Sequence, residues 1–129
     1  MLNDRRVHTT LPVADLAVAR AFWEGRLGFA PVAEYPTAVL YGAGEGTVFA
    51  VSRASARATG GNTQMAFTVT DIEAEVAVLR AKGIELQDYD LPGLRTVDGI
   101  AAMGGNRVAW FRDPDGNVIG VIAFGAAAG

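Results

Sequence analysis

The chain has 129 residues, of which 50% are hydrophobic and 19% charged, so it fits one compact domain, and its lack of cysteine excludes disulfides and zinc–thiolate sites. Its net charge is −3, and its Arg and Lys residues are scattered, so it lacks the basic patch of a nucleic-acid-binding protein. We find no signal-peptide core and no apolar run of membrane length, and we therefore expect a cytoplasmic protein without membrane or nucleic-acid partners.

The first part of the chain predicts a strand, a helix and three further strands. A short strand candidate carries the only histidine, His8, and leads into Asp15, which suits a helix N-cap because its carboxylate accepts free backbone N–H groups. Apolar residues then recur at helical spacing up to a stop at Gly28; they are Leu16, Ala19, Phe22, Trp23 and Leu27. Three strands are expected next, at Pro31–Tyr35, Ala38–Tyr41 and Thr47–Ser52.

The same order recurs in the second part of the chain. Val69-Thr70-Asp71-Ile72 repeats the pattern of Val13-Ala14-Asp15-Leu16, with Asp71 standing 56 residues after Asp15. A second helix is predicted from Ile72, Val76 and Leu79 up to Gly83. The strands expected after it are Ile84–Tyr89, Gly99–Met103, Arg107–Arg112 and Val118–Phe124.

This repeat predicts an α+β fold of two βαβββ modules within a single domain. A segment rich in Ala, Ser, Thr and Gly separates them, so we place module 1 at about residues 5–53, the linker at about 54–62 and module 2 at about 63–124.

A turn signature near the end of the chain predicts how the last two strands pair. In Asp113-Pro114-Asp115-Gly116-Asn117, Asp113 can cap the turn, Pro114 presets φ and Gly116 supplies a left-handed residue. Pairing Asp113 with Asn117 places Trp110 opposite Gly120, on the same face of the sheet. Period-two alternation assigns the following residues to that concave face, away from the helices: Arg6, His8, Thr10, Val48, Ala50, Ser52, Gln64, Ala66, Thr68, Val108, Trp110, Val118 and Ile122.

Taken together, these motifs resemble the vicinal oxygen chelate superfamily, which includes glyoxalases, extradiol dioxygenases and bleomycin-resistance proteins. The resemblance extends from about Arg6 to Phe124 and is carried by His8 to Leu16, by Leu27-Gly28-Phe29 and by Phe111 to Asn117. It implies paired βαβββ modules whose strands curl into a cup, with helices outside and the site on the concave face. It also implies a homodimer.

The resemblance further implies four positions for metal ligands, and this chain fills only two of them with donors. His8 matches the first position, and Gln64 offers an amide oxygen at the third. Ala50 and Gly120 stand at the second and fourth positions, where neither has a donor atom. Because a catalytic divalent site needs about three protein ligands, we expect no metal and no cofactor, unless Glu45, Asp90 or Asp98 enters the cup from a loop.

Several of the candidate site residues have two possible roles. His8 can contact a ligand, hydrogen-bond inside the cup or act as a base, and Trp110 can fill the core or form a platform for an aromatic ligand. Arg95 lies in a Gly/Pro-marked loop over residues 89–99 that we expect beside the cup mouth. It can clamp an anionic ligand or pair with Asp98 in solvent.

Three function classes follow from these residues. The leading one is a metal-independent protein that binds or sequesters a partly apolar or aromatic small molecule, such as an antibiotic or toxin; its ligand-binding set is His8, Ala50, Gln64, Arg95, Trp110 and Gly120. The second is a metal-free isomerase or lyase-type enzyme that uses His8 as its base. The third is a metal-dependent glyoxalase-like or dioxygenase-like enzyme.

Overall fold

The computed structural model describes residues 1–54 and 61–125. The chain separates into two compact units, Met1–Thr59 and Gly60–Gly129. The predicted linker at about residues 54–62 lies mostly outside the described residues. Within the described ranges, no helix is long and apolar enough to cross a membrane.

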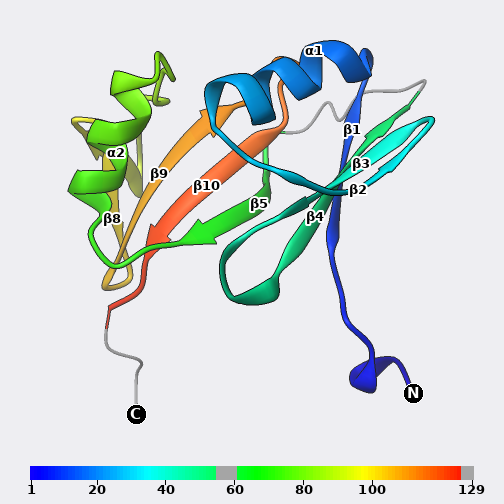
Figure 1. Ribbon diagram of the computed structural model, residues 1–129. Coiled ribbons are helices and arrows are strands. Elements are labelled where there is room, and N and C mark those ends of the chain that lie inside the picture. Colours follow the sequence, from blue (N-terminus) through cyan, green and yellow to red (C-terminus); the bar gives the residue numbers. More distant parts are fainter. Residues whose placement is uncertain (55–60, 126–129) are drawn as a thin grey trace. The chain divides into compact units, whose positions relative to one another are not determined.

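The first unit is a four-stranded mixed sheet with one longer helical segment, formed by α1 and η2, and two short 3-10 helices (Figure 1). Its elements are η1 (Leu2–Asp4), β1 (Thr9–Val13), α1 (Leu16–Arg20), η2 (Ala21–Arg26), β2 (Pro31–Tyr35), β3 (Ala38–Gly42), η3 (Gly44–Gly46) and β4 (Val48–Arg53). The strand order is β1-β4-β3-β2, with β1 parallel to β4 and the other pairs antiparallel. This is the predicted strand, helix and three further strands, except that His8 lies one residue before β1 instead of inside it.

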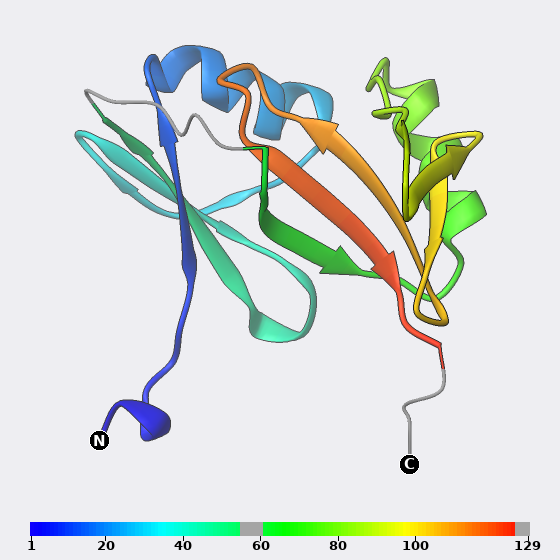
Figure 2. The same ribbon diagram turned by 180° about the vertical axis from the view of Figure 1, so that it is seen from behind.

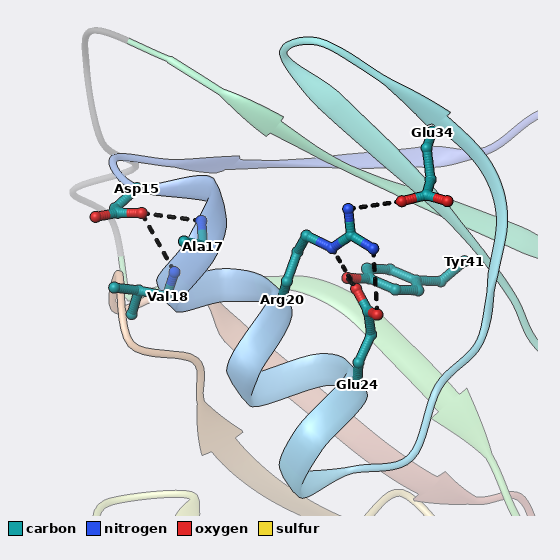
Figure 3. Close-up of polar contacts among 7 residues, drawn as sticks. All are labelled: Asp15, Ala17, Val18, Arg20, Glu24, Glu34 and Tyr41. Atoms are coloured by element: carbon teal, nitrogen blue, oxygen red, sulfur yellow. Dashed lines mark hydrogen bonds and ion pairs between the residues drawn. The ribbon is translucent and has the colours of Figure 1, made fainter.

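The first helix begins where the sequence predicts but widens in its second half. Asp15 caps it, because its Oδ1 accepts the N–H groups of Ala17 at 2.9 Å and Val18 at 3.3 Å (Figure 3). From Ala21 to Arg26 the backbone follows a π-helix, and Gly28, two residues beyond its end, lies in the left-handed region at φ 79°. One helical segment therefore fills the predicted range.

Aromatic rings form the core between this helical segment and its sheet. Trp23 is fully buried, and its ring centroid lies 4.9 Å from that of Phe49 and 5.5 Å from that of Phe29, edge to face in both cases. Leu11 and Val51 are buried as well. Leu11, Phe49 and Val51 alternate along their strands with residues predicted for the concave face, so the opposite face of this sheet forms the core.

The second unit repeats the same plan with one addition. Its elements are β5 (Thr63–Thr68), α2 (Ile72–Ala81), β6 (Asp90–Leu91), β7 (Leu94–Val97), β8 (Ile100–Met103), β9 (Asn106–Arg112) and β10 (Val118–Ala123). The strand order is β5-β10-β9-β8-β7-β6, with β5 parallel to β10 (Figure 2). The helix α2 is capped by Asp71 and lies against β9 and β10. Strands β6 and β7 are the addition, since the first unit has no counterpart for them.

Two predictions for the segment after α2 were wrong. Ile84–Tyr89 is not a strand; beside the part of β9 that β8 does not reach, it makes an isolated backbone hydrogen bond from Gln87 N to Trp110 O at 2.8 Å. The expected loop over residues 89–99 is largely the β6–β7 hairpin, which turns at Gly93 with φ 76°. Strand β7 then pairs with β8 and extends the sheet.

The predicted turn and register between β9 and β10 are confirmed. Asp113 N donates to Asn117 O at 3.1 Å, and Gly116 is left-handed at φ 83°. Trp110 pairs with Gly120, as the count outward from the turn predicted. This register decides which side chains share a face with Trp110.

Candidate functional site

The most distinctive face of the second unit is an apolar cluster around Trp110. Its buried members are Ala101, Val108, Trp110 and Val118, and its partly buried members are Tyr89, Leu94 and Ile122. The cluster contains no residue of α2. The sequence-based assignment of Trp110 to the face away from the helix therefore agrees with the structure, and we call this group the Trp110 cluster.

Trp110 is held in one orientation by a hydrogen bond and a ring contact. Its side chain starts on β9 and reaches over β10 to β5, where Nε1 donates to Thr63 Oγ1 at 3.0 Å. The Tyr89 ring meets the indole edge to face, with centroids 5.4 Å apart. Trp110 is only 8% exposed, so the partly buried Tyr89 offers more surface to a ligand than the indole does.

Gly120 lies beneath this bridge from Trp110 to Thr63. A Cβ added to Gly120 would lie 3.2 Å from Thr63 Cγ2 and 3.3 Å from Ala66 Cβ, closer than an ordinary contact. Gly120 also lies opposite Trp110, as the register predicted. The structure adds that the nearest neighbours of such a Cβ are side chains of β5.

Gln64 is bound into the turn between β9 and β10. Its Oε1 accepts the N–H of Val118 at 3.0 Å, and its Nε2 donates to Asn117 Oδ1 at 2.8 Å. Asn117 Nδ2 in turn donates to Asp113 Oδ2 at 2.7 Å. Both ends of the Gln64 amide are therefore engaged within the protein.

The carboxylate at the end of this network is buried. Asp113 is 5% exposed, and burial raises the pKa of its carboxyl even though Asn117 donates to it. Its Oδ1 also accepts the N–H groups of Asp115 at 3.0 Å and Asn117 at 2.8 Å. Asp113 thus organises the turn, as the sequence predicted.

In the first unit, His8 and Ala50 lie on the sheet face away from the helical segment. Thr10 pairs with Ala50, and alternation places His8 on the side of Thr10. His8 is exposed and Ala50 is buried. Of the two ligand-binding residues predicted in this unit, only His8 therefore has a side chain that can form a hydrogen bond with a ligand.

Arg95 lies on the other face of the second sheet from the Trp110 cluster. Thr96 pairs with Ala101, a member of the cluster, so the neighbouring Arg95 points to the opposite side. Its Nε donates to Asp90 Oδ1 at 2.9 Å, and both side chains are exposed. Of the two roles predicted for Arg95, an ion pair in solvent is present, but its partner is Asp90 and not the predicted Asp98, because the β6–β7 register sets Asp90 opposite Arg95.

A polar cluster on the helix side of the first unit was missed by the sequence analysis (Figure 3). Arg20 Nε donates to Glu24 Oε2 at 2.6 Å, and Arg20 Nη1 lies 2.7 Å from Glu34 Oε1. The hydroxyl of the fully buried Tyr41 donates to Glu24 Oε2 at 2.8 Å. The guanidinium of Arg20 lowers the pKa of Glu24, while burial raises the pKa of Tyr41. The four residues tie the helical segment to strands β2 and β3.

The donor atoms do not suit a metal ion at the positions that the resemblance implies. Ala50 and Gly120 have no donor, and the Gln64 oxygen already accepts a backbone N–H. In the part of the chain that the structure describes, no group of three or more His, Cys, Asp or Glu side chains could hold a metal. A divalent ion needs more ligands than His8 alone supplies.

Comparison with protein families agrees with the paired βαβββ units. The model of the Glyoxalase/Bleomycin resistance protein/Dioxygenase superfamily matches residues 5–121. The chain belongs to this superfamily. Curated proteins gave no match to the chain.

Solved structures of this superfamily share the fold at low sequence identity. A glyoxalase family protein from Enterococcus faecalis has a TM-score of 0.68 and 21% identity over 95% of this chain and 99% of that chain. The fosfomycin resistance protein FosX from Listeria monocytogenes has a TM-score of 0.66 and 20% identity, covering 92% of each chain. TnmS3, an antibiotic binding protein from Streptomyces sp. CB03234, has a TM-score of 0.62 and 23% identity over 92% of this chain and 96% of that chain.

Proposed function

We propose that this superfamily member is a metal-independent protein that binds a partly apolar or aromatic small molecule. The observation that carries the proposal is the Trp110 cluster, in which Tyr89, Leu94 and Ile122 remain partly exposed around a buried indole. Small-molecule sites are mostly apolar with a few placed polar groups, and this face has that composition. The cytoplasmic location expected from the sequence stays a prediction.

Two further observations support binding without a metal. Gly120 and Ala50 stand at positions where the superfamily resemblance implies metal donors, and the amide oxygen of Gln64 already accepts the N–H of Val118. Among proteins of similar fold, one is described as an antibiotic binding protein and another as a fosfomycin resistance protein. A sequestering role would use the same face.

Two measurements test this proposal. Elemental analysis after ordinary purification is expected to find less than stoichiometric Zn, Fe, Mn or Ni, and a stoichiometric metal would contradict metal independence. A thermal-shift screen of aromatic compounds, with and without a chelator, is expected to give stabilisation that the chelator leaves unchanged, because a ligand of the native state raises the melting temperature.

Variants then locate the bound compound. In Trp23→Phe, Trp110 is the only tryptophan, so a compound that stabilises the protein should change its fluorescence. Tyr89→Ala and Trp110→Ala should each weaken binding, by more than about 1 kcal/mol where the ring is an anchor. Unchanged affinity in both variants would remove the Trp110 cluster as the site.

We also propose that the protein forms a homodimer. Within the described ranges, β1 pairs only with β4, and β5 pairs only with β10, so each sheet has an open edge at its first strand. Open edges are commonly covered by another chain or element. Light scattering is expected to give twice the mass of one chain, and the mass of a monomer up to submillimolar concentration would contradict the dimer.

A further inference from the structure

We infer that Thr63 is a specificity-determining residue of the Trp110 face, where its hydroxyl donates a hydrogen bond to an acceptor, such as a carbonyl oxygen, on the apolar ligand. This inference rests on the proposed function, because it concerns the chemistry of the molecule that the Trp110 cluster would bind.

The position of Thr63 depends on an irregularity in strand β5. The β5–β10 register shifts between Val118 and Ile119, so Val118 pairs with Thr63, Ile119 pairs with Met65, and Gln64 is the extra residue. As a result Thr63 lies beside the indole of Trp110 and beside Gly120. Simple alternation had placed Gln64 on this face instead.

Polar contacts hold this irregularity in place. Gln64 accepts from Val118 N and donates to Asn117, which donates to Asp113. Asn117 and Asp113 are both buried. Because the amide of Gln64 is held at both ends, the backbone on either side of it is fixed, and so is the start of β5 that carries Thr63.

The hydrogen bond between Trp110 and Thr63 can run in only one direction. An indole N–H can only donate, so Thr63 Oγ1 is the acceptor and its own hydroxyl proton stays available. No other described residue accepts that proton, and Thr63 is exposed. An available donor thus stands at the border of an apolar cluster.

The surroundings of Thr63 on this face are mostly apolar. Tyr89, Leu94 and Ile122 are the partly buried members of the same cluster, and Arg95 points to the opposite face. Arg112, which shares the face of Trp110, binds Gln87 and the carbonyl of Gly116. These surroundings favour a ligand with an apolar body and an uncharged acceptor.

The test begins without any ligand. In a proton–nitrogen correlation spectrum the two tryptophans give two indole N–H signals, and Trp23→Phe identifies that of Trp110. Thr63→Val should move this signal upfield in the proton dimension and speed its exchange with water, while Thr63→Ser should preserve it. The control Thr68→Val removes a hydroxyl from the same strand, opposite Ile122, and should leave the signal unchanged.

The binding test uses 2-acetylnaphthalene and 2-ethylnaphthalene, which are alike in shape and differ in one carbonyl oxygen. We expect the wild type, Thr63→Ser and Thr68→Val to bind the acetyl compound roughly three- to tenfold more tightly, the usual effect of one hydrogen bond. Thr63→Val should bind both compounds equally. The backbone amide spectrum of Thr63→Val shows whether this variant is folded. If it is not folded, Thr63→Ala takes its place.

The outcomes separate this inference from the proposed function. The role of Thr63 would be overturned if the wild type and Thr63→Val bound the two naphthalenes with the same affinity ratio. It would also be overturned if only Thr68→Val lost the preference for the acetyl compound. Either result would leave an apolar site in place. Failure of both compounds to bind or shift any signal of the second unit would overturn the proposed site and, with it, this inference.

Discussion

Replacing Gly120 with alanine tests the close approach between β10 and β5. The added methyl would lie 3.2 Å from Thr63 Cγ2 and 3.3 Å from Ala66 Cβ, whereas carbon atoms pack best at about 3.5–4.0 Å. Either the two strands separate by a few tenths of an ångström or Thr63 turns away from the indole. Overpacking of this kind costs about 1–3 kcal/mol of stability. Replacing glycine also stabilises the protein by about 0.4–1 kcal/mol, because it restricts the conformations of the unfolded chain. We therefore expect Gly120→Ala to lower the free energy of unfolding by roughly 1 kcal/mol and the melting temperature by roughly 4 °C.

The assay is urea unfolding followed by circular dichroism, with Gly25→Ala as the matched control. A Cβ at Gly25 would have no neighbour within 4 Å, and Gly25 lies in the π-helical segment, so this variant should gain roughly 0.5–1 kcal/mol from helix propensity. Thr63→Ser removes Cγ2 and should recover part of the loss in the double variant. A Gly120→Ala protein as stable as the wild type, with its Trp110 indole signal unchanged, would refute the reasoning from contact distance.

Three pH predictions follow from the buried and paired groups. The pKa of Glu24 is lowered by Arg20, so the folded state holds its proton less tightly than the unfolded chain, and stability from this group is present above about pH 4.5 and lost as the pH falls. Glu24→Gln should therefore lose about 1 kcal/mol of stability near neutral pH, and its free energy of unfolding in urea should change less with pH below about 4.5. The pKa of Tyr41 is raised by burial, so stability should fall as the pH rises above about 10. Ultraviolet titration should show one of the three tyrosines ionising only when the protein unfolds, and Tyr41→Phe should remove this tyrosine from the titration. The pKa of Asp113 is also raised by burial, so its contribution to the free energy of unfolding decreases as the pH rises above about 3.8; Asp113→Asn should abolish this part of the slope, and an unchanged slope would contradict it.

The parts of the fold that follow a short-range rule could be predicted from the sequence. The caps at Asp15 and Asp71 depend on residues within the same helical turn. The pairing of Trp110 with Gly120 follows from the turn at Asp113 to Asn117, because antiparallel register is fixed once the loop length is known. The repeat of one strand, one helix and further strands is likewise visible from the spacing of Asp15 and Asp71.

The features that the sequence analysis missed depend on contacts between distant residues. The ion pair of Arg20 with Glu34 joins a helix to a strand, and only its i, i+4 partner Glu24 could be seen from spacing. The β6–β7 hairpin could have been recognised from Pro92-Gly93 between Leu91 and Leu94, but its position beside β8 is a tertiary result.

Gln64 shows how a residue type that suits a metal ligand can serve the fold instead. An amide oxygen at this position fits the ligand pattern that the superfamily resemblance implies, so the sequence alone leaves a metal possible. Here one register shift in β5 carries the side chain toward the turn, where its oxygen accepts Val118 N and its nitrogen binds Asn117. A metal could use only the remaining lone pair of that oxygen, in the orientation that the bonds to Val118 and Asn117 fix. The same shift brings Thr63 to Trp110, so the change that withdraws Gln64 from the site supplies the hydroxyl that we propose for ligand recognition.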